Sequence, residues 1–138
     1  MAKYEDHCRD CERILGSKRE EVNRWMDELF RQYGPNHRRH RHCWHGVREA
    51  KRLWGIEGAK AAIIHIVRDC GAVPDQRTYD ETNLGLVLAP DFMASDSEEA
   101  QANFKRSVEA DFKKAANKGC SVEVLTAEVL EKTAEEKV

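Results

Sequence analysis

Six histidines and five cysteines stand out in this chain of 138 residues, because their side chains bind metal ions, transfer protons or act as nucleophiles. Cys8 and Cys11 form a C-x-x-C pair, and His40 and Cys43 repeat the same spacing. Thiolate and imidazole are the usual ligands of tetrahedral zinc. If two helices touch through these residues, the four side chains could close a structural site for zinc.

A second candidate site combines imidazole and carboxylate ligands. His65 and Asp69 are four residues apart, so on a helix both side chains can reach one ion. His7 and either His37 or His40 could complete the set from other helices, as in open metal sites of helical bundles. An ion held in this way polarises water or a carbonyl group. The alternatives without a metal are a surface hydrogen bond between His65 and Asp69, and burial of the cysteines as small apolar groups.

Four helices are expected to position these residues. Apolar periodicity predicts them over residues 2–15, 17–33, 36–55 and 57–70, and a glycine ends each one. Ser17 and Glu20 match a capping box at the start of the second helix.

The same periodicity predicts which histidines and cysteines are buried. On the third helix, His40 and Cys43 share the apolar face, whereas His42 and His45 project to the opposite side with Arg38. We therefore expect four buried side chains in the thiol-containing set: Cys8, Cys11, His40 and Cys43.

The pattern changes after residue 74. Residues 84–89 and 120–125 read as short buried strands on either side of a helix over 95–119. The prediction is a mainly helical α+β fold, with a four-helix domain over 1–74 and a strand-helix-strand appendage with an acidic tail over 83–138, packed on the same core. Two strands alone make a marginal sheet, so they must pack on the helices, gain another strand or pair with a second chain, and a homodimer is expected.

The net charge of −2 conceals an uneven distribution. Residues 31–68 contain nine Lys or Arg and two acids, whereas residues 91–138 contain seven Lys or Arg and eleven acids. A basic helical face could follow phosphates, which makes a nucleic-acid partner a less favoured alternative. Its candidate residues are Arg38, Arg39, Arg41, Arg48 and Arg52.

Several classes of protein do not fit the sequence. No apolar run approaches the roughly 20 residues of a membrane span, and the first residues contain no apolar signal region. The odd number of cysteines argues against a disulfide framework, so we expect a cytoplasmic protein. The sequence also lacks a phosphate-binding loop, a dinucleotide fingerprint, a nucleophile elbow and an H-E-x-x-H motif.

The stretch HRRHRHCWHG, followed by HIVRDCGAVP, resembles an uncharacterised prokaryotic domain family with a His-rich helix and an H-x-x-x-D-x-G-x-x-P segment. The resemblance covers about residues 5–80. It implies a small helical domain and favours a metal, but it supplies no reaction. Where the family has a His-His pair, this chain has His42 followed by Cys43. The matching positions are His37, His42, Gly46, His65, Asp69, Gly71 and Pro74.

Three functions remain open. The first is a non-catalytic binding or interaction module stabilised by zinc or another divalent transition metal. The second is a metal-dependent enzyme that uses His65 and Asp69. The third is a nucleic-acid-associated protein that uses the basic face over residues 38–60.

Overall fold

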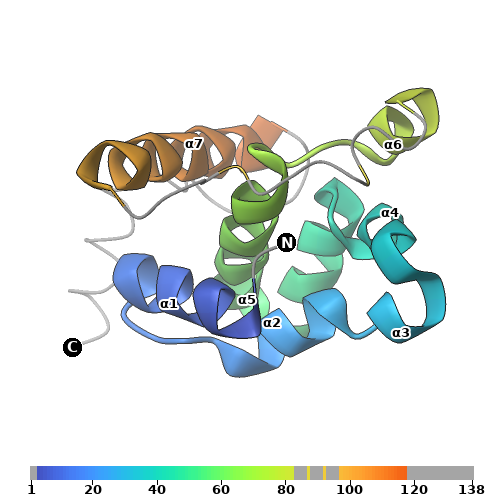
Figure 1. Cartoon of the computed structure of the whole chain (residues 1–138), viewed down its shortest axis with the longest axis horizontal. Helices are drawn as coiled ribbons and strands as arrows, with labels where there is room; N and C mark the ends of the chain where they lie inside the picture. Colours follow the sequence, from blue (N-terminus) through green and yellow to red (C-terminus); the bar gives the residue numbers. More distant parts are fainter. Residues whose placement is uncertain (1–2, 83–86, 88–91, 93–96, 118–138) are drawn as a thin grey trace.

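The structure is a computed structural model, and it describes residues 3–82, 87, 92 and 97–117. Its helices are α1 (Tyr4–Leu15), α2 (Glu20–Asp27), α3 (Phe30–Tyr33), a 3₁₀ turn η1 (Gly34–His37), α4 (Arg38–Arg41), α5 (Trp44–Cys70), α6 (Gln76–Thr82) and α7 (Glu98–Asn117). Helix α5 lies at the centre, with α1 and α2 on one side and α7 across the other (Figure 1).

The long helix α5 bends at Gly55, whose φ of 76° lies in the left-handed region that favours glycine. The predicted end of one helix at residue 55 is therefore a kink inside α5. The part after the kink is buried on all sides, from Gly58 to Asp69. Neighbouring elements therefore cover every face of this part of the helix, including the faces outside its apolar stripe.

One hydrophobic core joins α1, α2, α5 and α7. Phe104, Val108 and Phe112 of α7 are at most 2% exposed, and each such burial stabilises the fold by about 1.5–3 kcal/mol. They belong to the same cluster as Val22 of α2 and Ile63 of α5. The apolar faces predicted for these helices are thus the faces that pack.

The predicted fold class is wrong in its second half. The described residues contain no strand, and Val87, in the middle of the first predicted strand, lies in a turn. The rest of that strand and the whole of the second, over 120–125, lie outside the described residues. The helix between them is confirmed as α7, where the Ser97 hydroxyl accepts a hydrogen bond from the Ala100 backbone N–H. The described fold is helical.

The predicted helices over 17–33 and 36–55 are also divided. Helix α2 begins at Glu20 after Arg19, which has a left-handed φ of 49°, and the capping box expected at Ser17 does not form. The third helix is interrupted between Arg41 and Trp44. Gly46 allows this break, because a Cβ atom there would lie 1.8 Å from the carbonyl oxygen of Arg41. No described helix is long and apolar enough to cross a membrane.

Candidate metal site

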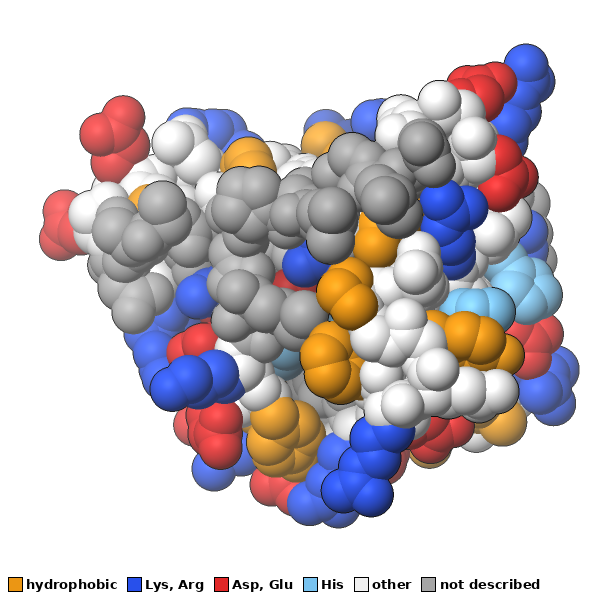
Figure 2. Space-filling view, turned by 45° about the vertical axis from the view of Figure 1, so that its right-hand side comes forward, with side chains coloured by type: hydrophobic (Ala, Val, Ile, Leu, Met, Phe, Trp, Pro, Cys, Tyr) orange, Lys and Arg blue, Asp and Glu red, His pale blue; other side chains and the backbone are white. Residues whose placement is uncertain are grey.

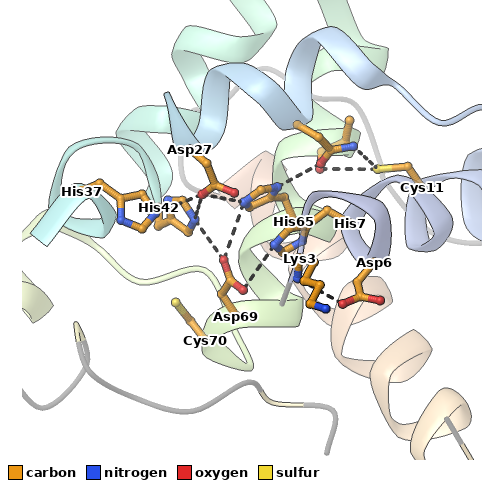
Figure 3. Close-up of polar contacts among 12 residues, drawn as sticks. Lys3, Asp6, His7, Cys11, Asp27, His37, His42, His65, Asp69 and Cys70 are labelled. Atoms are coloured by element: carbon orange, nitrogen blue, oxygen red, sulfur yellow. Dashed lines mark hydrogen bonds and ion pairs between the residues drawn. The ribbon is translucent and has the colours of Figure 1, made fainter. Parts of the chain in front are cut away.

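Four side chains that could hold a metal ion converge in the interior: Asp27, His42, His65 and Asp69. Each offers one ligand atom, and the four atoms lie within 4.8 Å of one another. Figure 3 shows the imidazole rings in a row, with the carboxylate of Asp27 on one side and that of Asp69 on the other. This arrangement could hold one metal ion.

Three separate segments bring these ligands together. Asp27 is the last residue of α2, and His65 and Asp69 lie one turn apart on α5. His42 follows α4, where the backbone leaves the helical conformation with φ −86° and ψ 57°. The Tyr79 hydroxyl donates a hydrogen bond of 2.5 Å to the carbonyl oxygen of His42. This bond from α6 holds the turn that directs His42 into the core.

The four distances between an imidazole nitrogen and a carboxylate oxygen of the cluster match those around a single ion. His42 Nε2 is 3.1 Å from Asp69 Oδ2 and 3.5 Å from Asp27 Oδ1, and His65 Nε2 is 3.3 Å from Asp27 Oδ1 and 3.6 Å from Asp69 Oδ2. Atoms bound about 2.0–2.1 Å from zinc at the tetrahedral angle lie about 3.3 Å apart. All four separations lie close to that value.

Asn23 determines which nitrogen of His65 faces the site. The Asn23 Nδ2 group donates to the carbonyl oxygens of Lys18 at 2.9 Å and Arg19 at 3.2 Å, so its Oδ1 faces His65 Nδ1 at 2.9 Å. Since Oδ1 only accepts hydrogen bonds, Nδ1 of His65 must carry the proton. Nε2 of a neutral His65 then directs its lone pair at Asp27 and Asp69. Metal-binding histidines are typically oriented in this way, by a partner of the other ring nitrogen.

His37 supports the site through Asp27. Its Nδ1 donates to the carbonyl oxygen of Gly34 at 2.8 Å, and its Nε2 lies 3.0 Å from Asp27 Oδ1. The side chain is buried, and its ring contacts that of His42 edge-on with centroids 5.0 Å apart. His37 therefore orients Asp27 from the turn η1.

His7 of α1 lies on the other side of the cluster. Its ring stacks on His65 with centroids 3.5 Å apart, and its Nε2 is 3.4 Å from Asp69 Oδ1. Burial opposes the charged form of His7, but the hydrogen bond to Asp69 and the charge of that carboxylate outweigh burial and raise its pKa. The buried ion pair between Asp10 and Arg68, at 3.1 Å, fixes α1 against α5 one turn away.

Burial keeps the two candidate imidazole ligands neutral. It lowers the pKa of His42 to about 4, and burial together with the nearby charge of His7 also lowers the pKa of His65. Burial would raise the pKa of the Asp69 carboxyl, but hydrogen bonds from His42 and His7 hold it well below its usual range. Neutral imidazoles and ionised carboxylates are the forms that bind metal.

The structure does not bring the two sulfur-containing pairs together into a metal site. Cys8 and Cys11 are buried against the Asn23 amide, at 3.8 and 3.5 Å from its Nδ2. Cys43 is buried elsewhere and donates to Gln76 Oε1 at 3.4 Å. Among the described residues, the cluster with metal-binding geometry contains no cysteine.

The expected burial of His40 is wrong, and so is the expected exposure of His42 and Arg38. His40 is exposed and stacks on Tyr33 with ring centroids 4.1 Å apart, whereas His42 is 0% and Arg38 2% exposed. The reason is the interruption before Trp44, because the helical periodicity does not extend across it. His65 and Asp69 lie in the cluster, and His7 and His37 lie beside it.

Most of the arginines proposed for nucleic acid have protein partners. Arg41 pairs with Glu28 at 2.7 Å and lies over the Trp25 ring, and Arg52 pairs with Glu49 at 2.8 Å. Figure 2 shows acidic and basic side chains interspersed over the face in view. Of the other three arginines proposed for nucleic acid, Arg38 is buried, Arg39 pairs with Asp80, and Arg48 is exposed.

The sequence interpretation missed two of the four candidate ligands, Asp27 and His42. His42 was expected to project away from the apolar face of its helix. Asp27 lies at the edge of the apolar stripe of a helix predicted to continue to residue 33, so nothing marked it as a ligand. In the structure it ends α2, which packs against α5.

No family model, no curated protein and no solved structure matches this chain.

Proposed function

We propose that this protein binds one divalent transition metal ion through Asp27, His42, His65 and Asp69. The observation that carries the proposal is the spacing of the four ligand atoms, at 3.1–3.6 Å for the four imidazole–carboxylate pairs. These separations fit one ion at ordinary ligand distances.

A cation also resolves the electrostatics of the cluster. Nδ1 of His65 donates to Asn23. Its Nε2 therefore faces the carboxylate oxygens of Asp27 and Asp69 with a lone pair unless a proton or a metal ion lies there. A divalent ion balances the two carboxylates and accepts the imidazole lone pairs.

The ligand types restrict the choice of metal. Two imidazoles and two carboxylates suit zinc, iron, manganese, cobalt or nickel, and the absence of thiolate from the cluster disfavours copper(I). The ion would join α2, the turn at His42 and α5, so its binding free energy would stabilise the tertiary structure. This supports a metal-stabilised protein whose ligands are not the cysteines expected from the sequence.

Metal analysis of protein purified without a polyhistidine tag tests the proposal. We expect about one ion per chain, and at a free metal concentration about 1,000 times Kd a stabilisation of about 4 kcal/mol. For a chain of this size that corresponds to an increase in Tm of about 10–20 °C. A chain that binds none of the five metals, with an unchanged Tm, would contradict the proposal.

Matched variants locate the site. His42→Ala and Asp69→Ala should remove the bound metal, and circular dichroism would show whether each variant still folds. His40→Ala is the control, because His40 is exposed and lies outside the cluster. A Cys8→Ser, Cys11→Ser double variant should keep the metal, and metal loss from this variant alone would favour the sulfur site instead.

A further inference from the structure

The four candidate ligands differ sharply in exposure. The side chains of His42, His65 and Asp69 are at most 2% exposed, whereas that of Asp27 is 32% exposed. Solvent therefore contacts the side chain of Asp27, at one edge of the cluster. We infer that the bound ion keeps an exchangeable coordination position there, which takes water or a small monoanion, and that the site is open rather than closed. This inference rests on the proposed metal site.

The two oxygens of Asp27 have different surroundings. Among the described residues, its polar contacts all reach Oδ1, from His37 at 3.0 Å, His65 at 3.3 Å and His42 at 3.5 Å. The other oxygen, Oδ2, has no polar partner in this part of the chain. An ion at the cluster would therefore be bound by Oδ1, and Oδ2 would be left to accept a hydrogen bond from a metal-bound water.

The number of protein ligands leaves room for another donor. Zinc with four ligands expands to five during catalysis, and ions such as manganese, iron, cobalt and nickel commonly accept more than four donors. Within the part of the chain that the structure describes, the other three ligands are buried, so an additional donor would approach beside Asp27. A metal ion that holds water at such a position lowers the pKa of that water and makes it a nucleophile.

Charge restricts the ligand class. Two carboxylates already balance a divalent ion, so a neutral or singly charged donor fits better than a polyanion. The ring of Phe30, 43% exposed, contacts His37 edge-on with centroids 5.3 Å apart. Phe30 thus packs against the residue that holds Asp27. Small donors of the expected charge include water, azide and formate.

Two measurements on the full chain test the inference after metal content has been determined. With Mn²⁺ bound, the relaxation rate of the solvent water protons should exceed the rate with diamagnetic Zn²⁺ bound to the same protein. The difference should be as large as exchange of a water molecule bound directly to the manganese requires. With Co²⁺ bound, azide should change the visible absorption spectrum in a saturable way. The His40→Ala variant should behave like the unmodified chain in both measurements.

The outcomes separate this inference from the proposed function. A metal-loaded protein with only outer-sphere relaxation and no response to azide has a closed site, and it would overturn the inference while leaving the metal site intact. A chain that binds no metal would overturn both. Phe30→Ala, at an exposed position, should keep the metal and still respond to azide. If this folded, metal-loaded variant lost both the relaxation increment and the azide response, the result would contradict a coordination position that opens beside Asp27.

Discussion

Replacing Asn23 tests the arrangement that directs His65 at the metal. Asn23 is 1% exposed, and its Oδ1 accepts the His65 Nδ1–H at 2.9 Å. Asn23→Leu keeps a similar volume but leaves this buried donor without an acceptor. We expect metal affinity to fall by about 10–100-fold, the usual effect of removing the partner of a metal-bound histidine, which corresponds to about 1.4–2.7 kcal/mol.

The same substitution should also reduce stability without metal. An unsatisfied buried donor costs about 1–3 kcal/mol, and the carbonyl of Lys18 loses its side-chain donor as well, whereas that of Arg19 keeps the backbone N–H of residue 23. Asn23→Asp separates the two effects. It keeps an oxygen opposite His65 but places another against the Lys18 carbonyl, so it should lose stability while retaining more metal affinity than Asn23→Leu.

Competition with a chromophoric chelator at neutral pH measures the affinity of the folded variants, and urea unfolding of the metal-free proteins measures stability. Asn103→Ala is the matched control, because Asn103 is exposed on α7 and far in sequence from the cluster. If folded Asn23→Leu binds metal as tightly as the unmodified chain, or if Asn23→Asp loses as much affinity as Asn23→Leu, then Asn23 does not set the tautomer of His65.

Three further predictions concern the framework around the site. Burial in the folded protein lowers the pKa of His42 from 6.5 to about 4. The contribution of neutral His42 to the free energy of unfolding, about 3 kcal/mol, is therefore present above pH 6.5 and lost as the pH falls towards 4. Urea unfolding of the metal-free protein should show this loss, and His42→Gln should reduce it. Arg68→Met leaves the Asp10 carboxylate buried and unpaired and should cost about 3–5 kcal/mol by the same assay, whereas an unchanged midpoint would mean that the pair contributes nothing. Gly46→Ala places a Cβ atom 1.8 Å from the Arg41 carbonyl oxygen. The variant should therefore have a Tm at least about 10 °C lower than the unmodified chain, or fail to fold. An unchanged Tm would show that the turn between Arg41 and Trp44 is not rigid.

Much of the helical framework was predictable from local patterns. The apolar stripes of α1, α2 and α7 contain residues that pack in the core. Gly16 and Gly71 follow the ends of α1 and α5, and Gly55 marks the bend within α5. The spacing of His65 and Asp69 also predicted two of the four candidate ligands, because residues four apart on a helix always share a face. These features depend on helical geometry alone.

The strand prediction failed where local patterns are weakest. An apolar run of six residues fits a buried strand or a short buried segment equally well, and periodicity does not separate the two. Val87 lies buried in a turn beside Cys43 and Tyr79, in a small cluster away from the main core. Tertiary contacts, rather than backbone propensity, account for its burial.

The sequence by itself determined that histidines, cysteines and carboxylates would lie on helices, and that His65 and Asp69 would point the same way. Only the tertiary structure decided which of the others meet them. His42 turns inward because the chain leaves the helical conformation before Trp44, and Asp27 joins because α2 ends beside α5. Both depend on contacts between segments far apart in sequence, whereas a helical pattern describes only residues within a few turns of one another.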